Sequence, residues 1–249
     1  MEKRNILITG GTSGIGLAAA RRFLAEGCRV LLIGRSEEKG RQALQALDSA
    51  QAFFFAADLS TTAACRQVAD EAGRLFTGVD CVVYAAGIYL EKAIEDMDEE
   101  TYDQVMNVNI KGMYFLAKYM LPLLKQRPAS SMLMVSSDAG VNGNYFCSAY
   151  CASKGAVTIF TKAVALELAS YNIRVNCICP GDIDTPLTRA QLDPGRDAEE
   201  QLSEMRALYP LGRIGTADEA AAVICFLASG QASFVTGAAW LVDGGLTAN

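Results

Sequence analysis

The fold is decided by the stretch Asn5-Ile6-Leu7-Ile8-Thr9-Gly10-Gly11-Thr12-Ser13-Gly14-Ile15-Gly16 and the alanine-rich segment 17–26 that follows it. Its first five residues have the apolar character of a short buried strand, and the segment that follows the glycines has a helical pattern. Glycines allow the backbone to approach a ligand closely, and a helix N-terminus presents free N–H groups to a pyrophosphate. A plain strand-to-helix turn rarely needs three spaced glycines, so the stretch predicts a dinucleotide-binding turn.

Strand-like and helical segments alternate along the rest of the chain, which predicts right-handed βαβ units and a parallel sheet. We therefore expect an α/β fold, a Rossmann-type doubly wound sheet of about seven strands with helices on both faces. No linker or repeat divides the sequence, so residues 1–249 are expected to form a single dinucleotide-binding and catalytic domain. Further strands are expected at 29–33, 52–56, 80–84, 132–135 and 173–178 and within 234–242, with helices at 61–76, 101–124, 149–170 and 216–228.

Composition narrows the classes of function. The 249 residues are 51% hydrophobic and carry a net charge of −6, without a basic stripe, which argues against nucleic acid and anionic membrane as partners. The longest apolar stretch, 220–228, is too short to span a membrane, and the N-terminus is not a signal peptide, so we expect a cytoplasmic protein with reduced cysteines. The absence of histidine excludes a Ser-His-Asp triad and argues against a metal site.

The residue that follows the second strand bears on the choice of nicotinamide cofactor. NAD-preferring sites place an acidic residue about 20 positions after the glycine turn, where it binds the ribose 2′-hydroxyl. Here that position is Gly34, and Arg35 follows it. A guanidinium favours a 2′-phosphate, so we predict a preference for NADP(H) over NAD(H). A basic residue at Ser13 would have strengthened this prediction.

A possible proton donor and acceptor lies in the segment Tyr150-Cys151-Ala152-Ser153-Lys154. Residues four apart share a helix face, so the Tyr150 phenol and the Lys154 ammonium are expected to point the same way. A nearby cation lowers the pKa of a phenol, which would make Tyr150 usable in acid–base chemistry. The same spacing also arises by chance, as an exposed Tyr resting on a Lys stem.

Several polar or glycine-containing segments would meet at one edge of the sheet. The glycine turn, Asp58, Gly87, Ser137 and Pro180-Gly181 all follow predicted strands. The carboxyl ends of parallel strands form the edge where ligands bind in such sheets. The element order alone therefore gathers these residues around one cleft.

The two asparagines and the glycine of the segment 107–112 are unfavourable inside a helix, which marks a further site.

With these residues in place, the chain resembles the short-chain dehydrogenase/reductase family over its whole length, from the first strand to the C-terminus. The resemblance rests on the motifs Thr9-Gly10-x-x-x-Gly14-x-Gly16, Ser137, Tyr150-x-x-x-Lys154, Pro180-Gly181 and Asp243-Gly244-Gly245.

The resemblance implies a catalytic role for four residues. Tyr150 would be the general acid/base, and Lys154 would lower the Tyr pKa and bind the nicotinamide ribose. Ser137 would position the substrate oxygen, and Asn109 would hold a proton-relay water near Lys154. The implied cofactor contacts are Gly10, Thr12, Ser13, Gly14, Ile15, Gly16, Arg35, Asp58, Leu59, Ala86, Gly87, Tyr150, Lys154, Pro180, Gly181, Ile183 and Thr185.

One segment departs from the family pattern. The family usually has Asn-Asn-Ala-Gly after the fourth strand, whereas this chain has Tyr84-Ala85-Ala86-Gly87. The missing amides remove polar contacts that brace the central strands, which puts the fine geometry of the cofactor pocket in doubt. The chemistry is less affected, because Gly87 and the four catalytic residues are present.

The substrate is less clear from the residues, and segment 187–210 is expected to be a mobile lid over it. A bulky apolar secondary alcohol, such as a hydroxysteroid or bile acid, fits candidate pocket residues Tyr89, Tyr145, Phe146, Leu187 and Leu192.

A 3-oxoacyl-(acyl-carrier-protein) reductase is the alternative, with Arg127 as a docking residue, although Tyr171 stands where such reductases are often basic. A non-catalytic cofactor sensor is a third possibility, disfavoured by the complete catalytic set. The resemblance also implies a homotetramer or homodimer assembled through the C-terminal end.

Overall fold

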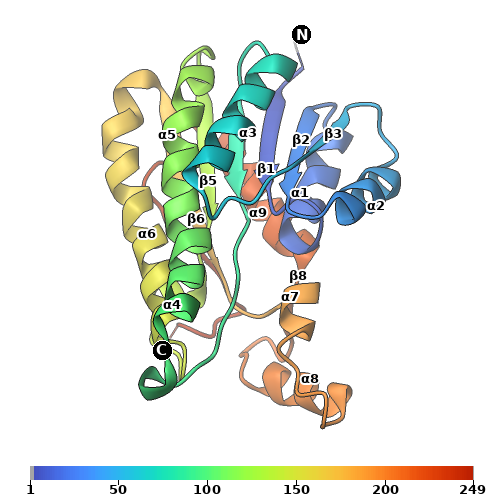
Figure 1. Cartoon of the computed structure of the whole chain (residues 1–249), viewed down its shortest axis with the longest axis vertical. Coiled ribbons are helices and arrows are strands. Elements are labelled where there is room, and N and C mark those ends of the chain that lie inside the picture. The colour runs from blue at the N-terminus through green and yellow to red at the C-terminus, as the bar shows by residue number, and fades with distance from the viewer. Residues whose placement is uncertain (1–2, 249) are drawn as a thin grey trace.

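The computed structural model describes residues 3–248 and contains the predicted parallel sheet. All six neighbouring strand pairs are parallel, and the spatial order is β3-β2-β1-β4-β5-β6-β9 (Figure 1). The chain reverses direction of winding between β1 and β4, the neighbours on either side of the switch point of a doubly wound fold. The strands are β1 (Asn5–Thr9), β2 (Arg29–Gly34), β3 (Ala52–Ala56), β4 (Cys81–Tyr84), β5 (Ser130–Val135), β6 (Ile173–Pro180) and β9 (Ala239–Val242).

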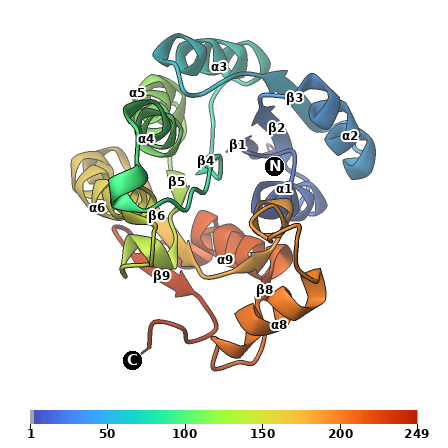
Figure 2. The same ribbon diagram turned by 60° about the horizontal axis from the view of Figure 1, so that its bottom comes forward.

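Helices cover both faces of the sheet, as predicted (Figure 2). One face carries α3, α5 and α6, and the other carries α1, α2 and α9, so the sheet is buried between two hydrophobic cores. The helices are α1 (Gly14–Ala25), α2 (Glu37–Leu47), α3 (Thr62–Leu75), α4 (Glu99–Met106), α5 (Gly112–Leu124), α6 (Ser148–Leu168), α7 (Pro186–Arg189), α8 (Ala198–Ala207) and α9 (Ala217–Ala228).

The first strand shows how the sequence produces this arrangement. All five of its residues are buried, and successive side chains point to opposite faces. Ile6 and Ile8 pack with α1 and α9, while Leu7 packs with the helices of the other face. A strand covered on both sides needs a continuous apolar run rather than an alternating pattern, which is what residues 6–8 supply.

Two segments differ from the sequence-based expectation. The predicted helix 101–124 is divided, because a π-helical turn at Asn107–Lys111 separates α4 from α5. The segment expected to be an unpatterned lid contains α7 and α8, and two short strands, β7 (Ile183–Asp184) and β8 (Gly215–Thr216), pair at its base. Single 3-10 turns occur at Ile94–Asp96, Asp138–Gly140, Ala169–Tyr171 and Gly230–Ala232.

Two smaller expectations are confirmed. The capping box at the start of α9 is present, with Glu219 N donating to Thr216 Oγ1 at 3.2 Å and Thr216 N donating to Glu219 Oε2 at 2.8 Å. The eight cysteines, all within the described residues, are free thiols. Of the helices in residues 3–248, none has both the length and the apolar character to cross a membrane.

Candidate active site

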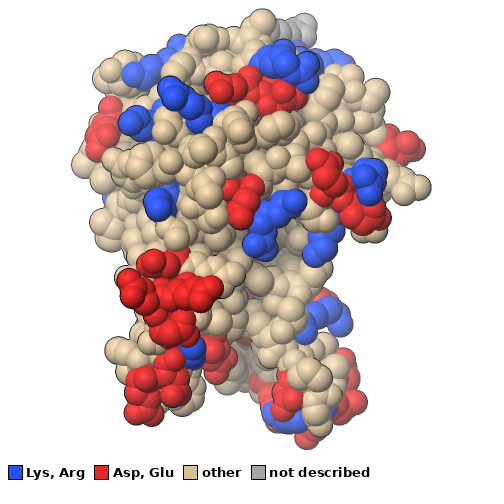
Figure 3. All heavy atoms as spheres, in the orientation of Figure 1, with Lys and Arg blue, Asp and Glu red and all other residues tan. Residues whose placement is uncertain are grey.

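A cleft of about 910 Å³ lies at the carboxyl ends of the strands. Figure 3 shows this side of the molecule hollowed between a lobe that ends in α4 and a lobe that ends in α8. Every residue predicted to contact the cofactor lines the cleft, and so does Ser137. Asn109 is the one predicted site residue outside the lining, because it lies behind Gly87. The sheet thus brings together side chains that are up to 175 positions apart between Gly10 and Thr185.

The glycine turn has the conformation that its glycines allow. Gly10 and Gly14 have φ angles of 63° and 50°, in the left-handed region that L side chains rarely adopt. A Cβ atom on Gly16 would lie 2.4 Å from the Gly10 carbonyl oxygen, so the first turn of α1 can close on the loop only without a side chain. Ser13, the N-cap residue, accepts no hydrogen bond through its side chain within the described structure. The free N–H groups of α1 therefore face the cleft and fit a pyrophosphate.

Tyr150 lies in the first turn of α6 and faces the cleft. Its side chain is 8% exposed, and the ring of Tyr89 packs edge-on against it with centroids 5.0 Å apart. Burial raises the pKa of the Tyr150 phenol, because it disfavours the charged phenolate, and a hydrogen bond with the Ser137 hydroxyl acts in the opposite direction. The edge-on contact and the burial together hold the hydroxyl in one place.

Lys154 lies one helical turn further along α6 and is also buried. Its Nζ atom donates to the Val135 carbonyl oxygen at 2.9 Å and lies 5.7 Å from the centre of the Tyr150 ring. Burial lowers the pKa of the ammonium to about 8. Desolvation dominates the pKa of Tyr150, and the Lys154 ammonium is directed at a backbone carbonyl, so the lowering of the Tyr150 pKa by Lys154 stays a prediction.

The π-helical turn between α4 and α5 positions Asn109. Its Nδ2 atom donates to the Ile88 carbonyl oxygen at 2.9 Å and to Ser153 Oγ at 3.0 Å, while Ile88 N donates to Asn109 Oδ1 at 2.8 Å. A Cβ atom on Gly87 would lie 3.4 Å from both Asn109 Oδ1 and Lys154 Nζ. Asn109 therefore ties the loop after β4 to α6, directly behind Lys154.

Ser137 and its neighbour form a second polar group at the edge of the cleft. Ser137 Oγ donates to Asp138 Oδ1 at 2.7 Å and accepts from Ala139 N at 3.2 Å. Asn144 Nδ2 donates to the other carboxylate oxygen of Asp138 at 3.2 Å. Sequence reasoning missed Asp138, although its place directly after Ser137 was visible.

At the far end of the cleft, Arg35 is joined by Lys39, which sequence reasoning also missed. Lys39 lies in the first turn of α2, where Lys39 N donates to the capping Ser36 Oγ at 3.2 Å. Two cations thus line the end of the cleft next to β2. Asp58 also lines it, and its Oδ1 atom accepts from Ser60 N at 3.1 Å, as the side chain of a turn residue does.

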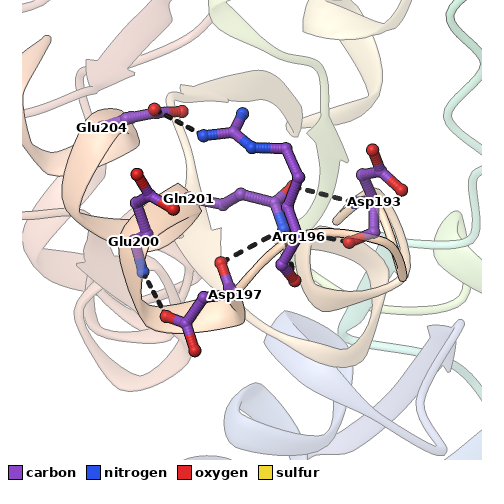
Figure 4. Close-up of polar contacts among 6 residues, drawn as sticks. All are labelled: Asp193, Arg196, Asp197, Glu200, Gln201 and Glu204. Atoms are coloured by element: carbon purple, nitrogen blue, oxygen red, sulfur yellow. Dashed lines mark hydrogen bonds and ion pairs between the residues drawn. The ribbon is translucent and has the colours of Figure 1, made fainter.

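The lid is more ordered than its sequence predicts. Gln201 of α8 accepts from Asp193 N at 2.8 Å and donates to the Asp193 carbonyl oxygen at 3.0 Å, which ties the turn before α8 to the helix (Figure 4). Arg196 and Glu204 form an ion pair at 2.6 Å across the same unit. The segment therefore packs as a small helical unit rather than a loose loop.

The substrate-pocket prediction is partly wrong. Tyr89, Tyr145 and Leu187 line the cleft, but Phe146 and Leu192 do not. Phe146 points to solvent, and Leu192 packs into the cluster formed by Leu202, Tyr209 and Ile214 beneath the lid. The lid instead contributes Met205, Leu208 and Tyr209, whose positions on and after α8 were hidden by the absence of a clear helical pattern.

The segment 84–87, which departs from the family pattern, is held by a hydrogen bond to the neighbouring strand. Ala86 N donates to Thr9 Oγ1 at 3.1 Å, which connects the loop after β4 to the end of β1. Tyr84 is fully buried, and among the described residues its hydroxyl has no hydrogen-bond partner. The Thr9 hydroxyl thus supports the loop after β4, and the Tyr84 ring packs in the hydrophobic core.

Comparisons with known proteins agree with this geometry. The model of the family described as enoyl-(acyl carrier protein) reductase matches residues 10–247. The NADP-dependent (R)-specific alcohol dehydrogenase of Lentilactobacillus kefiri is 37% identical over 97% of this chain and 96% of its own. The 3-oxoacyl-(acyl-carrier-protein) reductase of Thermotoga maritima is 35% identical over 99% and 98%. A solved structure, an actinorhodin polyketide ketoreductase variant with NADPH, superimposes with a TM-score of 0.93 at 31% identity, over 98% of this chain and 97% of its own.

Proposed function

The chain belongs to the short-chain dehydrogenase/reductase family, and from that membership we propose that it interconverts a secondary alcohol and a ketone with NADP(H). The observation that carries the proposal is the continuity of one cleft from the glycine turn to Tyr150 and Ser137. The nicotinamide cofactor, when bound, supplies or accepts the hydride. The side chains of this protein supply the proton and the positioning.

The proton passes at the Tyr150 hydroxyl. In ketone reduction the phenol donates to the substrate oxygen, and in alcohol oxidation it accepts from it. Burial disfavours the phenolate, so Tyr150 carries its proton before a ketone is reduced. Lys154 would bind ribose hydroxyls through its ammonium, and Asn109 would keep the proton path behind Lys154 in place.

The preference for NADP(H) rests on the cationic end of the cleft. Arg35 and Lys39 both line it, and a 2′-phosphate carries the negative charge that such a pair stabilises. We measure kcat/KM with NADPH and with NADH on one ketone substrate. An NADPH preference of about tenfold or more is expected from charge-assisted contacts, and a clear NADH preference would contradict the proposal.

The substrate remains a choice between two candidates. A bulky apolar alcohol such as a hydroxysteroid is supported by the Tyr89, Leu187, Met205 and Leu208 side chains along the cleft. A 3-oxoacyl thioester is supported by the description of the family model and by the name of a relative. Against it, Arg127 forms an ion pair with Asp80 at 3.4 Å and is not available for docking. NADPH consumption with a keto-steroid and a β-ketoacyl thioester, side by side, separates the two.

We also propose that the protein assembles as a homodimer or homotetramer. Leu166 and Ile159 of α6 and Leu241 of β9 are large apolar side chains that are exposed on the chain. Large exposed apolar side chains are covered when they lie in an interface between subunits. Light scattering coupled to gel filtration measures the mass, and a species of about one 26.6 kDa chain would contradict this proposal.

A further inference from the structure

The Ser137 hydroxyl has its single proton committed to Asp138. The Ser137 Oγ atom donates to Asp138 Oδ1 at 2.7 Å, and Ala139 N donates to one of its lone pairs at 3.2 Å. The Ser137 hydroxyl is also hydrogen-bonded with the Tyr150 hydroxyl. A hydroxyl has one donor and two acceptor sites, so while its proton lies on Asp138 the Ser137 oxygen can only accept, from Tyr150 or from a ligand in the cleft.

This arrangement conflicts with binding a ketone, which is the substrate of the proposed reduction. A carbonyl oxygen only accepts hydrogen bonds, so Ser137 helps to hold it only by turning its proton away from Asp138. The Asp138 carboxylate then loses a donor, and a hydrogen bond to a charged group is among the stronger ones to lose. Asn144, which donates to the other carboxylate oxygen, does not replace it.

We infer that Asp138 is a specificity-determining residue that selects substrates with a hydroxyl or amine donor on the carbon next to the reacting carbon. That donor takes the place of the Ser137 hydroxyl at Asp138 Oδ1, and the Ser137 proton turns to the substrate oxygen. Only hydrogen bonds are exchanged in this step. The inference rests on the proposed function and narrows its substrate class to hydroxy ketones, amino ketones and the corresponding diols and amino alcohols.

The charges along the cleft agree with a donor-rich substrate. Of the cleft-lining residues in the described part of the chain, the cations are Arg35, Lys39 and the catalytic Lys154. The substrate end carries the carboxylates of Glu91, Asp138 and Asp182. Carboxylates repel anionic substrates and accept from hydroxyl and ammonium groups.

Asp138 is distinguished from the other two carboxylates by its partner. Glu91 Oε2 accepts from the Tyr89 hydroxyl at 3.1 Å, and the Asp182 carboxyl is hydrogen-bonded to the Tyr209 hydroxyl. Both of these partners are fixed aromatic side chains outside the catalytic set. Asp138 is the one of the three whose hydrogen-bond donor, the Ser137 hydroxyl, also takes part in the proposed reaction. We therefore expect Asp138, and not the other two, to bind the group next to the carbonyl.

The test compares cyclohexanone with 2-hydroxycyclohexanone, which differ by one hydroxyl next to the carbonyl. With NADPH, the wild-type protein is expected to show about tenfold or higher kcat/KM for the hydroxy ketone, the range of one charge-assisted hydrogen bond. In Asp138→Ala the ratio is expected to fall to about 1, because Ser137 is free to donate and the hydroxyl has no acceptor. Asp138→Asn, which keeps the shape, is expected to give an intermediate ratio.

Glu91→Gln is the matched control, since it removes one negative charge from the same end of the cleft without contacting Ser137. It is expected to keep the wild-type ratio, whereas a loss there equal to that in Asp138→Ala would overturn the inference in favour of a general charge effect. Equal kcat/KM for the two ketones in the wild type, or a ratio that survives Asp138→Ala, also overturns it. Failure to consume NADPH with either ketone counts against the proposed function itself.

Discussion

The two ends of the cleft are built by different means. At the cofactor end the backbone does the shaping, because Gly10 and Gly14 adopt left-handed φ angles and Gly16 leaves no room for a side chain. At the substrate end, side chains from loops and from α8 form the walls, with Tyr209 and Asp138 as examples. A backbone constraint appears in the sequence as a glycine at a fixed spacing. A wall made of side chains has no such signature, which is why the first end was predicted almost in full and the second only in part.

The largest expected effect is a loss of turnover, without a loss of cofactor binding, when the Tyr150 hydroxyl at the substrate end is removed. Tyr150→Phe removes the hydroxyl that exchanges the proton and leaves the buried ring beside Tyr89. We expect kcat to fall by about a thousandfold while the cofactor dissociation constant changes by less than about threefold. Stopped-flow turnover and a fluorescence titration with NADPH measure the two. Tyr102→Phe, on an exposed position of α4, is the control, and residual turnover near the wild-type level in Tyr150→Phe would refute the role.

The next effect tests whether the cofactor end depends on backbone geometry. In Gly16→Ala the new Cβ would lie 2.4 Å from the Gly10 carbonyl oxygen, so the turn has to open. We expect about 3 kcal/mol of lost stability in denaturant unfolding and cofactor binding at least tenfold weaker. Gly230→Ala is the matched change, because nothing lies within 4 Å of its Cβ position. Wild-type stability in Gly16→Ala would mean that the turn tolerates a side chain.

A smaller effect is expected from the side chains that line the cofactor end of the cleft. Arg35→Ala is expected to lower kcat/KM with NADPH by about tenfold and to change the value with NADH by less than about threefold. Arg41→Ala removes a cation from the exposed face of α2, where it pairs with Glu38, and serves as the control. If both cofactors lose activity equally in Arg35→Ala, the residue supports the fold rather than the 2′-phosphate.

The smaller of the two effects on stability is expected where the two ends meet, at Lys154. Its folded-state pKa of about 8 is below the ordinary lysine value of 10.5, so burying the charged form destabilises the protein most below pH 8, and this cost disappears as the pH rises towards 10.5. Lys154→Met is therefore expected to be more stable than the wild type by about 2 kcal/mol at pH 7, and the gain is expected to shrink above pH 8.

Urea unfolding at pH 7 and pH 10 measures this gain, with Lys162→Met on the same helix as the control. The Lys154 variant is also expected to lose most of its turnover, because it lacks the ammonium. A variant less stable than the wild type at pH 7 would show that the bond to the Val135 carbonyl outweighs the burial cost.

The sequence accounts for the sheet and for most of the catalytic geometry. Strand positions follow from apolar runs, and the parallel order follows from their alternation with helices, so the meeting of Gly10, Ser137, Tyr150 and Lys154 was predictable. The pKa values of the side chains in the cleft were not predictable. The pKa of Tyr150 depends on burial and on where the Lys154 ammonium points, and neither is encoded in a four-residue spacing.

The lid has a helical structure that the sequence pattern also did not predict. Its residues 187–210 lack a strong apolar periodicity because α8 buries only a narrow face, formed by Gln201 and Leu202. Gln201 fixes the preceding turn through backbone groups, and a polar side chain gives no signal of such a role in the sequence (Figure 4). Helices held by polar contacts are therefore the elements that pattern reading misses.

The position of Asn109 depends on the extra residue that the π-helical turn at Asn107–Lys111 contains. A π-helical turn holds one residue more than an α-helical turn would, and each residue in a helix advances the side-chain direction by about 100°. Deleting a single residue there would let α4 and α5 run on as one regular helix and would rotate Asn109 away from Ser153. One codon inserted or removed at this turn would therefore be enough to gain or lose the link that Asn109 makes between the loop after β4 and α6.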